Sequence, residues 1–463
     1  EEMPSPLIGV LMKMYRWIVT GLLCMMGISM YAVTRIVDIT GAGQYTSIQT
    51  AINASNPGDS VLVYPGRYYE SITITTNDIS LFSMEYLTNN QDYINSTIID
   101  GNGDNLCLRI LNNTQNVFVR GFPLTHGRGV LLYPSSLSRI ENCDIFDNSS
   151  LNGAGLSLLL GSTYLSGVEI YNNYAYNMGG GLFIDGYMGT VNITFDPGNR
   201  CSIYNNTAGA GQDIVAHSIN NDLSIPLDKF TVANPTSYYA APFRASGNEF
   251  QLLIDAETFH HEEVNHDLYV SPTGDDTNDG LSPATALKTI RTAVYRVASD
   301  SLNQKTVHIL PGSYSRTANQ QVFPIPLKSW VKVKGAGIEE TQIVGEMDPA
   351  YASVQYNPLK VFASFYQTHA NLENMSITSA GSNNSCAIWG FYEESLHLKK
   401  LRLHELSPDQ NAVINITYAF NTLWDKVILE DIVTDGYGFV SCQGNLSGVI
   451  KDCTFRNGVN TFT

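Results

Sequence analysis

A short pattern of apolar positions recurs along this chain. It reads apolar, two variable residues, apolar, one variable residue, apolar. The copies are Val119/Phe122/Leu124, Ile140/Cys143/Ile145, Leu165/Val168/Ile170, Gly198/Cys201/Ile203, Leu372/Met375/Ile377, Leu398/Leu401/Leu403, Val427/Glu430/Ile432 and Ile450/Cys453/Phe455. Within the first four and the last four copies, the final positions lie 21 to 33 residues apart, a period typical of solenoid coils. Residues two apart face the same side of a strand, so each copy predicts one short strand with an inward face. Loops of variable length between such strands predict an all-β fold, the parallel β-helix.

The register of this pattern places several side chains. Cys143, Cys201 and Cys453 share the second slot, so we expect all three to be buried, reduced and packed as small hydrophobic residues. Glu430 also occupies this slot, where it marks a bulge, a shifted register or a functional exception. Three asparagines follow the last slot of their copies by three residues: Asn148, Asn173 and Asn206. Amides that repeat at the strand spacing predict a hydrogen-bonded ladder in preference to a ligand site.

The composition is that of a large β-protein with an acidic surface. The 463 residues include 38 glycines and 26 tyrosines, and charged residues make up only 15% of the chain. With 43 acidic against 26 basic residues, the formal net charge is −17, which disfavours nucleic acid as a partner. The same charge disfavours an acidic polysaccharide unless a cation bridges the two surfaces.

Residues 1–32 have the features of extra upstream residues followed by a secretory signal peptide. Lys13 and Arg16 precede the apolar run 17–31, and cleavage is expected after Ala32. The run is short and interrupted by Gly, Ser and Thr, so we expect no stable transmembrane span in the mature chain. These features predict a protein that is secreted, extracellular or on the outer cell surface.

One opening sequence occurs twice and divides the remaining chain. Residues 45–52 and 287–294 each predict a short amphipathic helix, and each precedes a strand that ends in a Pro-Gly turn. Such a helix can cover the open end of a solenoid. We therefore expect two tandem β-helix modules, each with a short N-terminal capping helix: 33–264, which includes a linker, and 265–463. The last copy of the pattern lies near Thr463, so we expect the second module to be truncated at its C-terminus.

Both modules resemble a known superfamily. DLYVSPTGDDTNDGLSPATALKTI (267–290), followed by VHILPGSY (307–314), resembles the opener of pectin-lyase-like right-handed parallel β-helix proteins. In the first module, IFDN (145–148), IYNN (170–173) and GGGL (179–182) resemble repeats of polymorphic outer-membrane and adhesin-type β-helices. The resemblance implies right-handed solenoids. It implies no particular chemistry, because polysaccharide lyases, glycan hydrolases and non-catalytic surface proteins share an opener that carries no catalytic residue.

Two segments are candidate metal sites. Asp275, Asp276 and Asp279 lie in one turn and suggest calcium, although their spacing does not match an EF-hand and carboxylates also suit turns. Residues of metal-ligand type also gather at the module junction: His260, His261, Glu262, Glu263, His266 and Asp267. A solvated polar linker is the alternative there. We expect no cofactor to be required, and calcium is the cation that the turn suggests.

A basic patch in the second module is the candidate catalytic site: Lys399, Lys400, Arg402 and His404. A lyase needs a base and a cation beside its acidic sugar, and these residue types supply both. Leu401 and Leu403 are expected to point inward, so Arg402 and His404 should face outward. An exposed ion pair from Arg402 to Asp431 of the next coil is the alternative interpretation.

Tyrosines in the first module are candidate sugar contacts: Tyr171, Tyr174, Tyr176 and Tyr204. Exposed rings stack on sugar faces, but tyrosine is also a common β-sheet residue. Taken together, the sequence predicts a non-catalytic glycan-binding or adhesin-like protein whose partner is an extracellular polysaccharide or surface glycan. A polysaccharide lyase or glycoside hydrolase is the alternative, and it requires acidic and basic side chains on one outer sheet.

Overall fold

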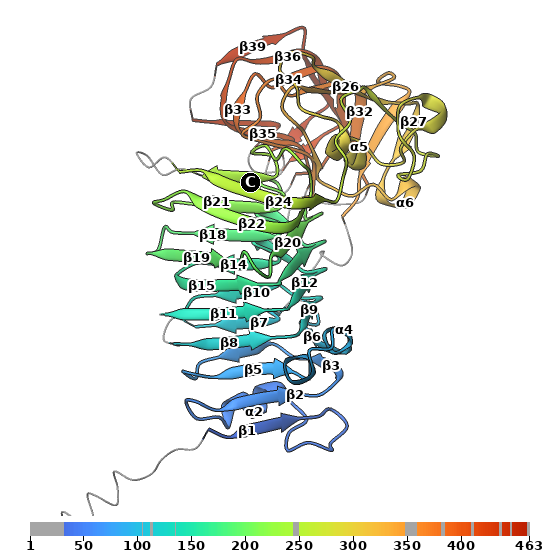
Figure 1. Cartoon of the computed structure of the whole chain (residues 1–463). Coiled ribbons are helices and arrows are strands. Elements are labelled where there is room, and N and C mark those ends of the chain that lie inside the picture. The colour runs from blue at the N-terminus through green and yellow to red at the C-terminus, as the bar shows by residue number, and fades with distance from the viewer. Residues whose placement is uncertain are drawn as a thin grey trace, which may run out of the picture.

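The computed structural model describes residues 32–103, 105–111, 114–134, 136–243, 250–347, 359–380, 385–408, 412–434, 438–444 and 447–460. The expected signal peptide lies outside these residues, apart from Ala32. Strands stacked in parallel dominate the molecule, and helices are few and short (Figure 1). The chain is therefore an all-β protein built from parallel β-helices, as the recurring pattern predicted.

Three long sheets and one short sheet form the coils of residues 34–259. Sheet A has the order β1 (Thr34–Val37), β2 (Ser60–Val63), β5 (Ser80–Ser83), β8 (Val117–Arg120), β11 (Leu137–Glu141), β15 (Gly161–Ser166) and β19 (Val191–Phe195). Sheet B has the order β24 (Leu252–Phe259), β22 (Leu223–Phe230), β20 (Cys201–Tyr204), β16 (Glu169–Tyr171), β12 (Asp144–Phe146), β9 (Pro123–Thr125), β6 (Thr97–Asp100) and β3 (Gly66–Tyr69). Sheet C has the order β23 (Ala240–Phe243), β21 (Ile214–His217), β18 (Leu182–Asp185), β14 (Leu156–Leu158), β10 (Val130–Leu132), β7 (Leu108–Ile110) and β4 (Ile72–Ile74). The short sheet pairs β13 (Ser149–Asn152) with β17 (Tyr174–Met178).

Two further sheets form the coils that begin at residue 268. The main path of sheet D is β25 (Leu268–Val270), β26 (Lys305–Ile309), β29 (Val331–Gly335), β32 (Asn371–Ser379), β34 (His397–His404), β36 (Thr422–Glu430) and β39 (Gly448–Lys451). Beside that path lie β27 (Gly312–Tyr314), β30 (Thr341–Gly345) and β40 (Thr454–Arg456). Sheet E has the order β28 (Ile325–Pro326), β31 (Leu359–Phe365), β33 (Ser385–Glu394), β35 (Ile414–Phe420) and β38 (Val440–Gln443). A last small sheet pairs β37 (Val433–Thr434) with β41 (Val459–Asn460).

Short helices accompany the coils: α2 (Ile48–Asn53), α3 (Glu85–Thr88), α4 (Asp92–Ser96), α5 (Ile290–Arg296) and α6 (Arg316–Asn319), with a 3-10 turn at Pro283–Thr285. The two repeated opener sequences form α2 and α5. The Ser47 hydroxyl accepts a hydrogen bond from the Thr50 amide, and the Thr289 hydroxyl accepts one from the Thr292 amide, so both helices have a hydroxyl N-cap. Their apolar faces are buried in the cores.

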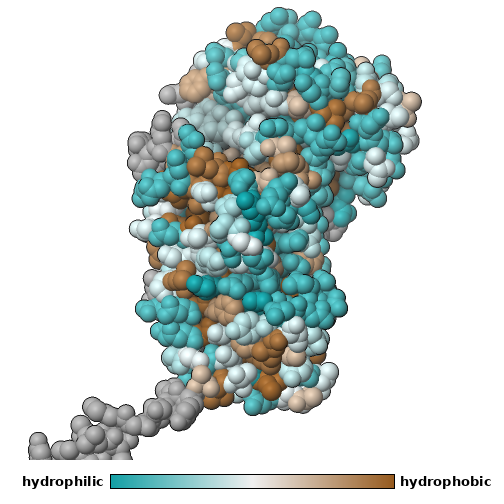
Figure 2. Space-filling model, viewed as in Figure 1, coloured by the Kyte–Doolittle hydropathy of each residue, from teal (hydrophilic) through white to brown (hydrophobic). Residues whose placement is uncertain are grey.

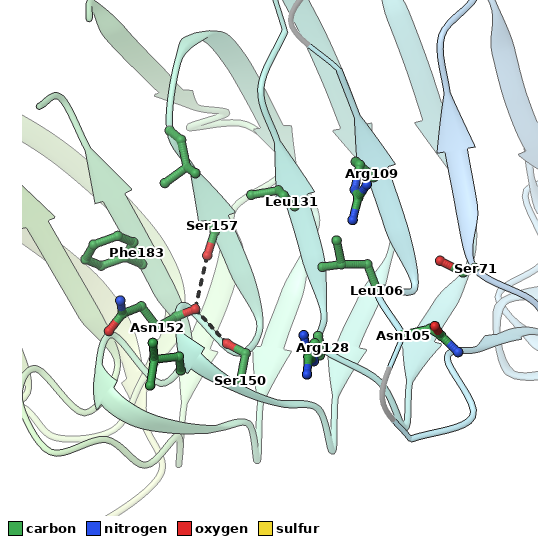
Figure 3. Close-up of a pocket in the computed structure, with 12 residues that line it drawn as sticks. Ser71, Asn105, Leu106, Arg109, Arg128, Leu131, Ser150, Asn152, Ser157 and Phe183 are labelled. Atoms are coloured by element: carbon green, nitrogen blue, oxygen red, sulfur yellow. Dashed lines mark hydrogen bonds between the residues drawn. The ribbon is translucent and has the colours of Figure 1, made fainter. Parts of the chain in front are cut away.

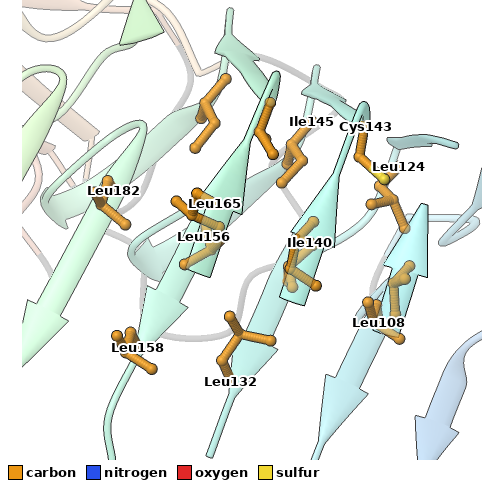
Figure 4. Packing of buried hydrophobic residues seen from close by; sticks show 14 of the residues in the cluster. Leu108, Leu124, Leu132, Ile140, Cys143, Ile145, Leu156, Leu158, Leu165 and Leu182 are labelled. Carbon is orange, nitrogen blue, oxygen red and sulfur yellow. The ribbon is translucent and has the colours of Figure 1, made fainter. Parts of the chain in front are cut away.

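Inward-facing aliphatic residues from successive coils stack to form each core, as Leu132 and Leu158 do (Figure 4). Cys143 and Cys201 are fully buried free thiols, and burial raises the pKa of each to about 12. Cys453 is only half-buried, so the prediction of burial was wrong for this residue. It lies on the last described coil beside the exposed Ile450 and Phe455, and no described coil stacks on that side to cover it.

In the first set of coils, the recurring pattern spans a corner and not a single strand. In the copy around Cys143, Ile140 belongs to β11 of sheet A, whereas Ile145 belongs to β12 of sheet B. Asn142 lies between them with φ of 47°, the left-handed conformation that Asn and Gly adopt most readily. Gly121 and Gly167 occupy the same corner in neighbouring coils. The prediction that each copy forms one strand was therefore wrong for these coils, because a bend between two strands preserves the inward direction of all three apolar side chains. In the second set of coils it was right, since Leu372/Met375/Ile377 lies within β32 and Leu398/Leu401/Leu403 within β34.

The last coils of the second set, from Ile377 onward, have a constant period that corrects the predicted register. Ile377, Leu403, Leu429 and Phe455 are successive register partners, each 26 residues from the next. The seventh copy is therefore Trp424/Val427/Leu429, and all three side chains are buried. Glu430 is the partner of His404 and lies outside the apolar slots. Of the three explanations for Glu430, the shifted register is the one that the structure shows.

The three asparagines form a continuous hydrogen-bonded ladder inside a corner of the first module. Asn148 Nδ2 donates to Asn173 Oδ1 at 3.1 Å, and Asn173 Nδ2 donates to Asn206 Oδ1 at 3.0 Å. Asn206 Nδ2 donates to Asp213 Oδ1 at 3.0 Å, so a carboxyl group ends the ladder. Gly155 leaves the necessary room, because a Cβ there would lie 2.5 Å from a neighbouring carbonyl oxygen and 3.0 Å from Asn173 Nδ2.

We expect Asp213 to make the stability of the protein depend on pH near neutrality. Burial raises the pKa of Asp213 from 3.8 to about 7, so the unfolded chain ionises this group at a lower pH than the folded chain. Its contribution to stability is therefore greatest below pH 4 and is lost as the pH rises to 7. The variant Asp213→Asn keeps an Oδ1 acceptor for Asn206 without the charge. Relative to wild type it should gain about 2 kcal/mol or more between pH 5 and pH 8.

Chemical denaturation at the two pH values measures this gain. An equal difference between variant and wild type at pH 5 and pH 8 would show that Asp213 is not the titrating group.

The two sets of coils are packed against each other. Helix α5 contributes Ile290 to the second core, whereas its Tyr295 belongs to the first core cluster. The Tyr295 hydroxyl donates to Asn206 O at 3.1 Å, beside the end of the asparagine ladder. The helix therefore starts the second solenoid and also covers the end of the first.

A second contact joins the outward faces of sheets C and E. An apolar cluster contains Phe183, Ala210, Val215, Ala241 and Phe243 from the first set of coils and Ala363 and Phe365 from the second, with Trp389 and Phe391 packed against it. The far end of the outward face of sheet C is thus covered, and the part nearer β4 is left open. On the face of the molecule shown in Figure 2, hydrophilic residues predominate and hydrophobic residues form separate patches.

Candidate functional site

The carboxylates of the predicted calcium turn are each engaged by protein donors. Asp275 accepts from the amide and hydroxyl of Thr277, and Asp279 accepts from the Leu281 amide. Asp276 accepts from the amide and hydroxyl of Thr289, and so anchors the start of α5. Among the described residues, no three His, Cys, Asp or Glu side chains are grouped so that they could hold a metal ion. The arrangement explains these carboxylates as turn and helix anchors, and calcium at this turn stays a prediction.

The histidine-rich junction also separates into individual contacts. The ring of His260 lies 5.1 Å from that of Tyr204, and the ring of His261 lies 5.7 Å from that of Tyr295. Burial lowers the pKa of His261 to about 3, so this ring is neutral at physiological pH. Other members of the segment have partners elsewhere: Glu263 pairs with Lys328, and Asp267 with His308.

The basic patch of the second module is neutralised by acidic neighbours. Arg402 forms an ion pair with Glu430 and a second one with Glu339. Asp431, the partner expected from the sequence, is not the residue that Arg402 pairs with. The register partner of Arg402 is Ile428, three residues before Asp431. Arg456 also pairs with Glu430, which is 2% exposed. Such a network explains Arg402 as a structural cation.

The other residues of this patch lie apart from Arg402 or are covered. His404 is buried at the edge of the ion-pair network, so the expectation that it faces solvent was wrong. Burial, with the positive charge of Arg402, lowers its pKa. Lys400 is exposed at the corner of its coil, with φ of 48°. No acid–base centre open to a substrate results from these three side chains.

The predicted tyrosines divide into two pairs. Phe146, Tyr171 and Tyr204 stack on the outward face of sheet B, with centroid distances of 5.1 and 5.3 Å and nearly parallel rings. Both faces of Tyr171 are therefore occupied by neighbouring rings, so a sugar could reach only ring edges and hydroxyls. Tyr176 is buried beside Trp389 of the second module, so it is not available as a sugar contact. Tyr174 lines a small hollow together with Arg316 and Val322 of that module.

An acidic pair lies beside this aromatic stack. Asp144 and Glu169 are register partners on β12 and β16 and face outward from sheet B. Burial, followed by the negative charge of Glu169, raises the pKa of Asp144 to about 6. The Tyr204 hydroxyl lies 3.3 Å from Glu169 Oε2 as a donor. A carboxyl whose pKa is raised toward neutrality, next to a second carboxyl, is an arrangement that can support acid–base chemistry.

An open groove lies on the outward face of sheet C, where the second module leaves it uncovered. Register partners along this face run Thr73, Arg109, Leu131, Ser157, Phe183, Val215 and Ala241. Val215 and Ala241 lie under the second module, and the groove extends from Phe183 towards Ser71 with a volume of about 690 Å³. Figure 3 shows Arg109, Leu131, Ser157 and Phe183 on neighbouring strands along its floor.

A short strand forms the rim of this groove. The Ser150 hydroxyl donates to Asn152 O at 2.6 Å, and the Ser157 hydroxyl donates to Gly153 O at 3.2 Å and to Asn152 O at 3.3 Å (Figure 3). These bonds hold β13 against the floor strand β14. Gly153 has φ of 57°, and a Cβ there would lie 2.1 Å from Ser157 Oγ, so the rim depends on glycine at this position. The groove is therefore preformed, as ligand sites usually are.

Two arginines give the groove its charge. Arg109 projects from β7 into the groove, and Arg128 comes from the segment just before β10 (Figure 3). Both side chains are exposed, and within the described residues neither forms an ion pair. No acidic residue is among the described residues that line the groove. The other lining side chains provide apolar surface, as Leu131 and Phe183 do, and polar groups such as Asn105.

Sequence reasoning did not find this groove. Arg109 lies between Leu108 and Ile110, whose inward direction already indicates that Arg109 faces outward. Arg128 lies in a turn, and no motif links the two positions. The sequence does not show which outward sheet faces pack against each other, or how much of sheet C the second module covers.

Comparisons with known proteins add little to this description. No protein-family model and no curated protein matches the chain. A solved structure similar in part is the crystal structure of alginate lyase from Paenibacillus sp. str. FPU-7, with 11% sequence identity and a TM-score of 0.25, covering 90% of this chain and 99% of that one. Among the described residues, no helix is both long and apolar enough to cross a membrane.

Proposed function

We propose that this chain is an extracellular or cell-surface β-helix protein that binds a glycan in the groove on sheet C. The observation that carries the proposal is the groove itself, a preformed trough of about 690 Å³ on the part of the sheet that the second module leaves open. This volume lies within the range of about 300–1,000 Å³ that is typical of small-ligand sites.

The lining matches the chemistry of a sugar chain. A sugar presents hydroxyl groups around a ring with apolar C–H faces. Asn105 and Asn152 provide amide donors and acceptors, whereas Leu131, Leu159 and Phe183 provide apolar surface. The floor follows neighbouring strands of one sheet, so it can contact consecutive units of a polymer. The expected secretion signal, which lies outside the described residues, is consistent with a partner outside the cell.

Filling the groove should weaken glycan binding. We expect Leu131→Trp to weaken binding of oligosaccharides by about tenfold or more, because the indole would occupy the floor of the trough. The matched control is Leu137→Trp, which places the same change on the exposed side of β11 in sheet A. A panel of neutral and acidic oligosaccharides, tested by isothermal titration calorimetry, measures the effect. Binding that survives in Leu131→Trp, or that falls equally in Leu137→Trp, would contradict the groove as the site.

A glycoside-cleaving enzyme is the second candidate, favoured by one specific observation. Asp144 and Glu169 are adjacent outward carboxyls, and the raised pKa of Asp144 suits a general acid. The same titrations can be followed for new reducing ends and for ultraviolet-absorbing unsaturated products. Release of either product by wild type, and its loss in Asp144→Asn, would favour the enzyme over the binding protein.

A further inference from the structure

We propose that the ligand of the sheet C groove is an anionic glycan whose acidic groups pair with Arg109 and Arg128. This inference rests on the proposed function, because it names the class of glycan that the same groove binds. It reverses the expectation from net charge alone, which disfavours acidic polysaccharides unless a cation bridges them.

Most of the described arginines of this chain pair with carboxylates. There are 43 acidic residues and only 26 lysines and arginines, so most cations are expected to find a carboxylate nearby. The structure shows this for seven arginines: Arg35, Arg67, Arg120, Arg139, Arg200, Arg402 and Arg456 each form an ion pair. Arg109 and Arg128 are exposed, have no acidic partner within the described residues and line one groove. Arg291 and Arg296 form no ion pair among these residues either, but they donate to Tyr295 OH and Asn278 O.

The neighbours of the two arginines leave both guanidinium groups open to an anion. Arg109 has Thr73 and Leu131 as register partners, so no side chain beside it on the sheet carries charge. Arg128 stands near the rim formed by β13, and its backbone amide donates to Asn105 O at 2.8 Å, which fixes the segment that carries it. The planar guanidinium group presents paired donors that match a carboxylate or a sulfate ester. Two such groups in one trough suit a polymer that carries repeated acidic groups.

An acidic pair of the first set of coils lies on a different sheet from Arg109. Sheet B carries Asp144 and Glu169, and Asp147 follows β12 of that sheet. Arg109 lies on β7 of sheet C, and Arg128 lines the same groove. An acidic sugar in the groove would meet Arg109 and Arg128, and no acidic residue is among the described residues that line it.

The test compares acidic oligosaccharides with neutral forms of the same chain. Oligogalacturonate and its fully methyl-esterified form differ only in charge, and a sulfated oligosaccharide distinguishes sulfate from carboxylate recognition. We expect the full chain to bind at least one acidic ligand about tenfold or more tightly than the methyl ester. The double variant Arg109→Ala/Arg128→Ala should lose this preference, and Arg109→Lys/Arg128→Lys should retain part of it, because lysine keeps the charge without the paired donors.

The matched control removes one arginine elsewhere. Arg139→Ala changes an exposed arginine of sheet A that already pairs with Glu141, and it should leave the preference intact. Equal binding of the acidic and esterified ligands, lowered by Leu131→Trp, would overturn the inference while the groove remains a glycan site. Binding of none of these ligands and of no neutral oligosaccharide would overturn the proposed function as well.

Discussion

Replacing Asn173 by alanine should lower the free energy of unfolding by about 3–5 kcal/mol, because it removes the central rung of the ladder. Asn173 Nδ2 donates to Ile145 O at 2.8 Å, to Tyr171 O at 3.0 Å and to Asn206 Oδ1 at 3.0 Å. Its Oδ1 accepts from the Asn148 amide at 3.2 Å and from Asn148 Nδ2 at 3.1 Å. Alanine replaces none of these bonds, and Asn173 is 1% exposed, so water cannot replace them without entering the corner.

Chemical denaturation of Asn173→Ala and of a control variant measures this effect. Asn192→Ala is the control, since Asn192 lies on β19 at the surface and its side chain donates only a 3.4 Å bond to Ser162 Oγ. It should change the free energy of unfolding by no more than about 0.5 kcal/mol. A loss below about 1 kcal/mol for Asn173→Ala would show that the ladder does not hold the coils together.

Replacing Lys328 by alanine should destabilise the junction of the two sets of coils by about 3–5 kcal/mol. The Lys328 side chain is fully buried and donates to Val297 O at 2.7 Å, to Glu263 Oε1 at 2.9 Å and to Tyr239 OH at 3.3 Å. Burial lowers the pKa of Lys328, whereas the charge of Glu263 acts in the opposite direction and favours the ionised amine. Alanine leaves the mostly buried Glu263 carboxylate without its cation.

Two further variants separate the ion pair from general packing at this junction. Lys328→Met/Glu263→Gln removes both charges and keeps most of the volume, so it should recover much of the loss. Lys332→Ala removes a half-exposed lysine whose nearest carboxylate oxygen, on Glu373, is 4.0 Å away, and it should cost no more than about 1 kcal/mol. Thermal unfolding followed by circular dichroism measures all three. A double variant as unstable as Lys328→Ala would contradict an unpaired Glu263 as the cause.

The sequence predicted the coils because their apolar slots must face inward in any stacked solenoid. Cys143 and Cys201 are buried, and Asn148, Asn173 and Asn206 join in a ladder, since both results follow from register alone. The corner within the copies of the first set of coils was missed because hydrophobicity does not encode a bend. The signal for it was present, as Gly or Asn occupies the left-handed position at residues 121, 142 and 167.

The candidate sites were less predictable because they depend on contacts between distant coils. An error of three residues in one copy paired Arg402 with Asp431, whereas the 26-residue period brings Glu430 beside it. Tyr176 was placed among the sugar contacts because the sequence does not show that sheet E covers part of sheet C. Outward apolar residues such as Phe183 and Val215 were the available sign of that contact. The groove that remains beside it could be located only once the covered area was known.

The crystal structure of the full chain with a bound acidic oligosaccharide tests the central claim most directly. The account predicts a sugar chain in the groove on sheet C, between Ser71 and Phe183, with acidic groups within hydrogen-bonding distance of Arg109 and Arg128. An oligosaccharide bound beside Asp144 and Glu169 on sheet B, with the sheet C groove empty at a saturating ligand concentration, would contradict it.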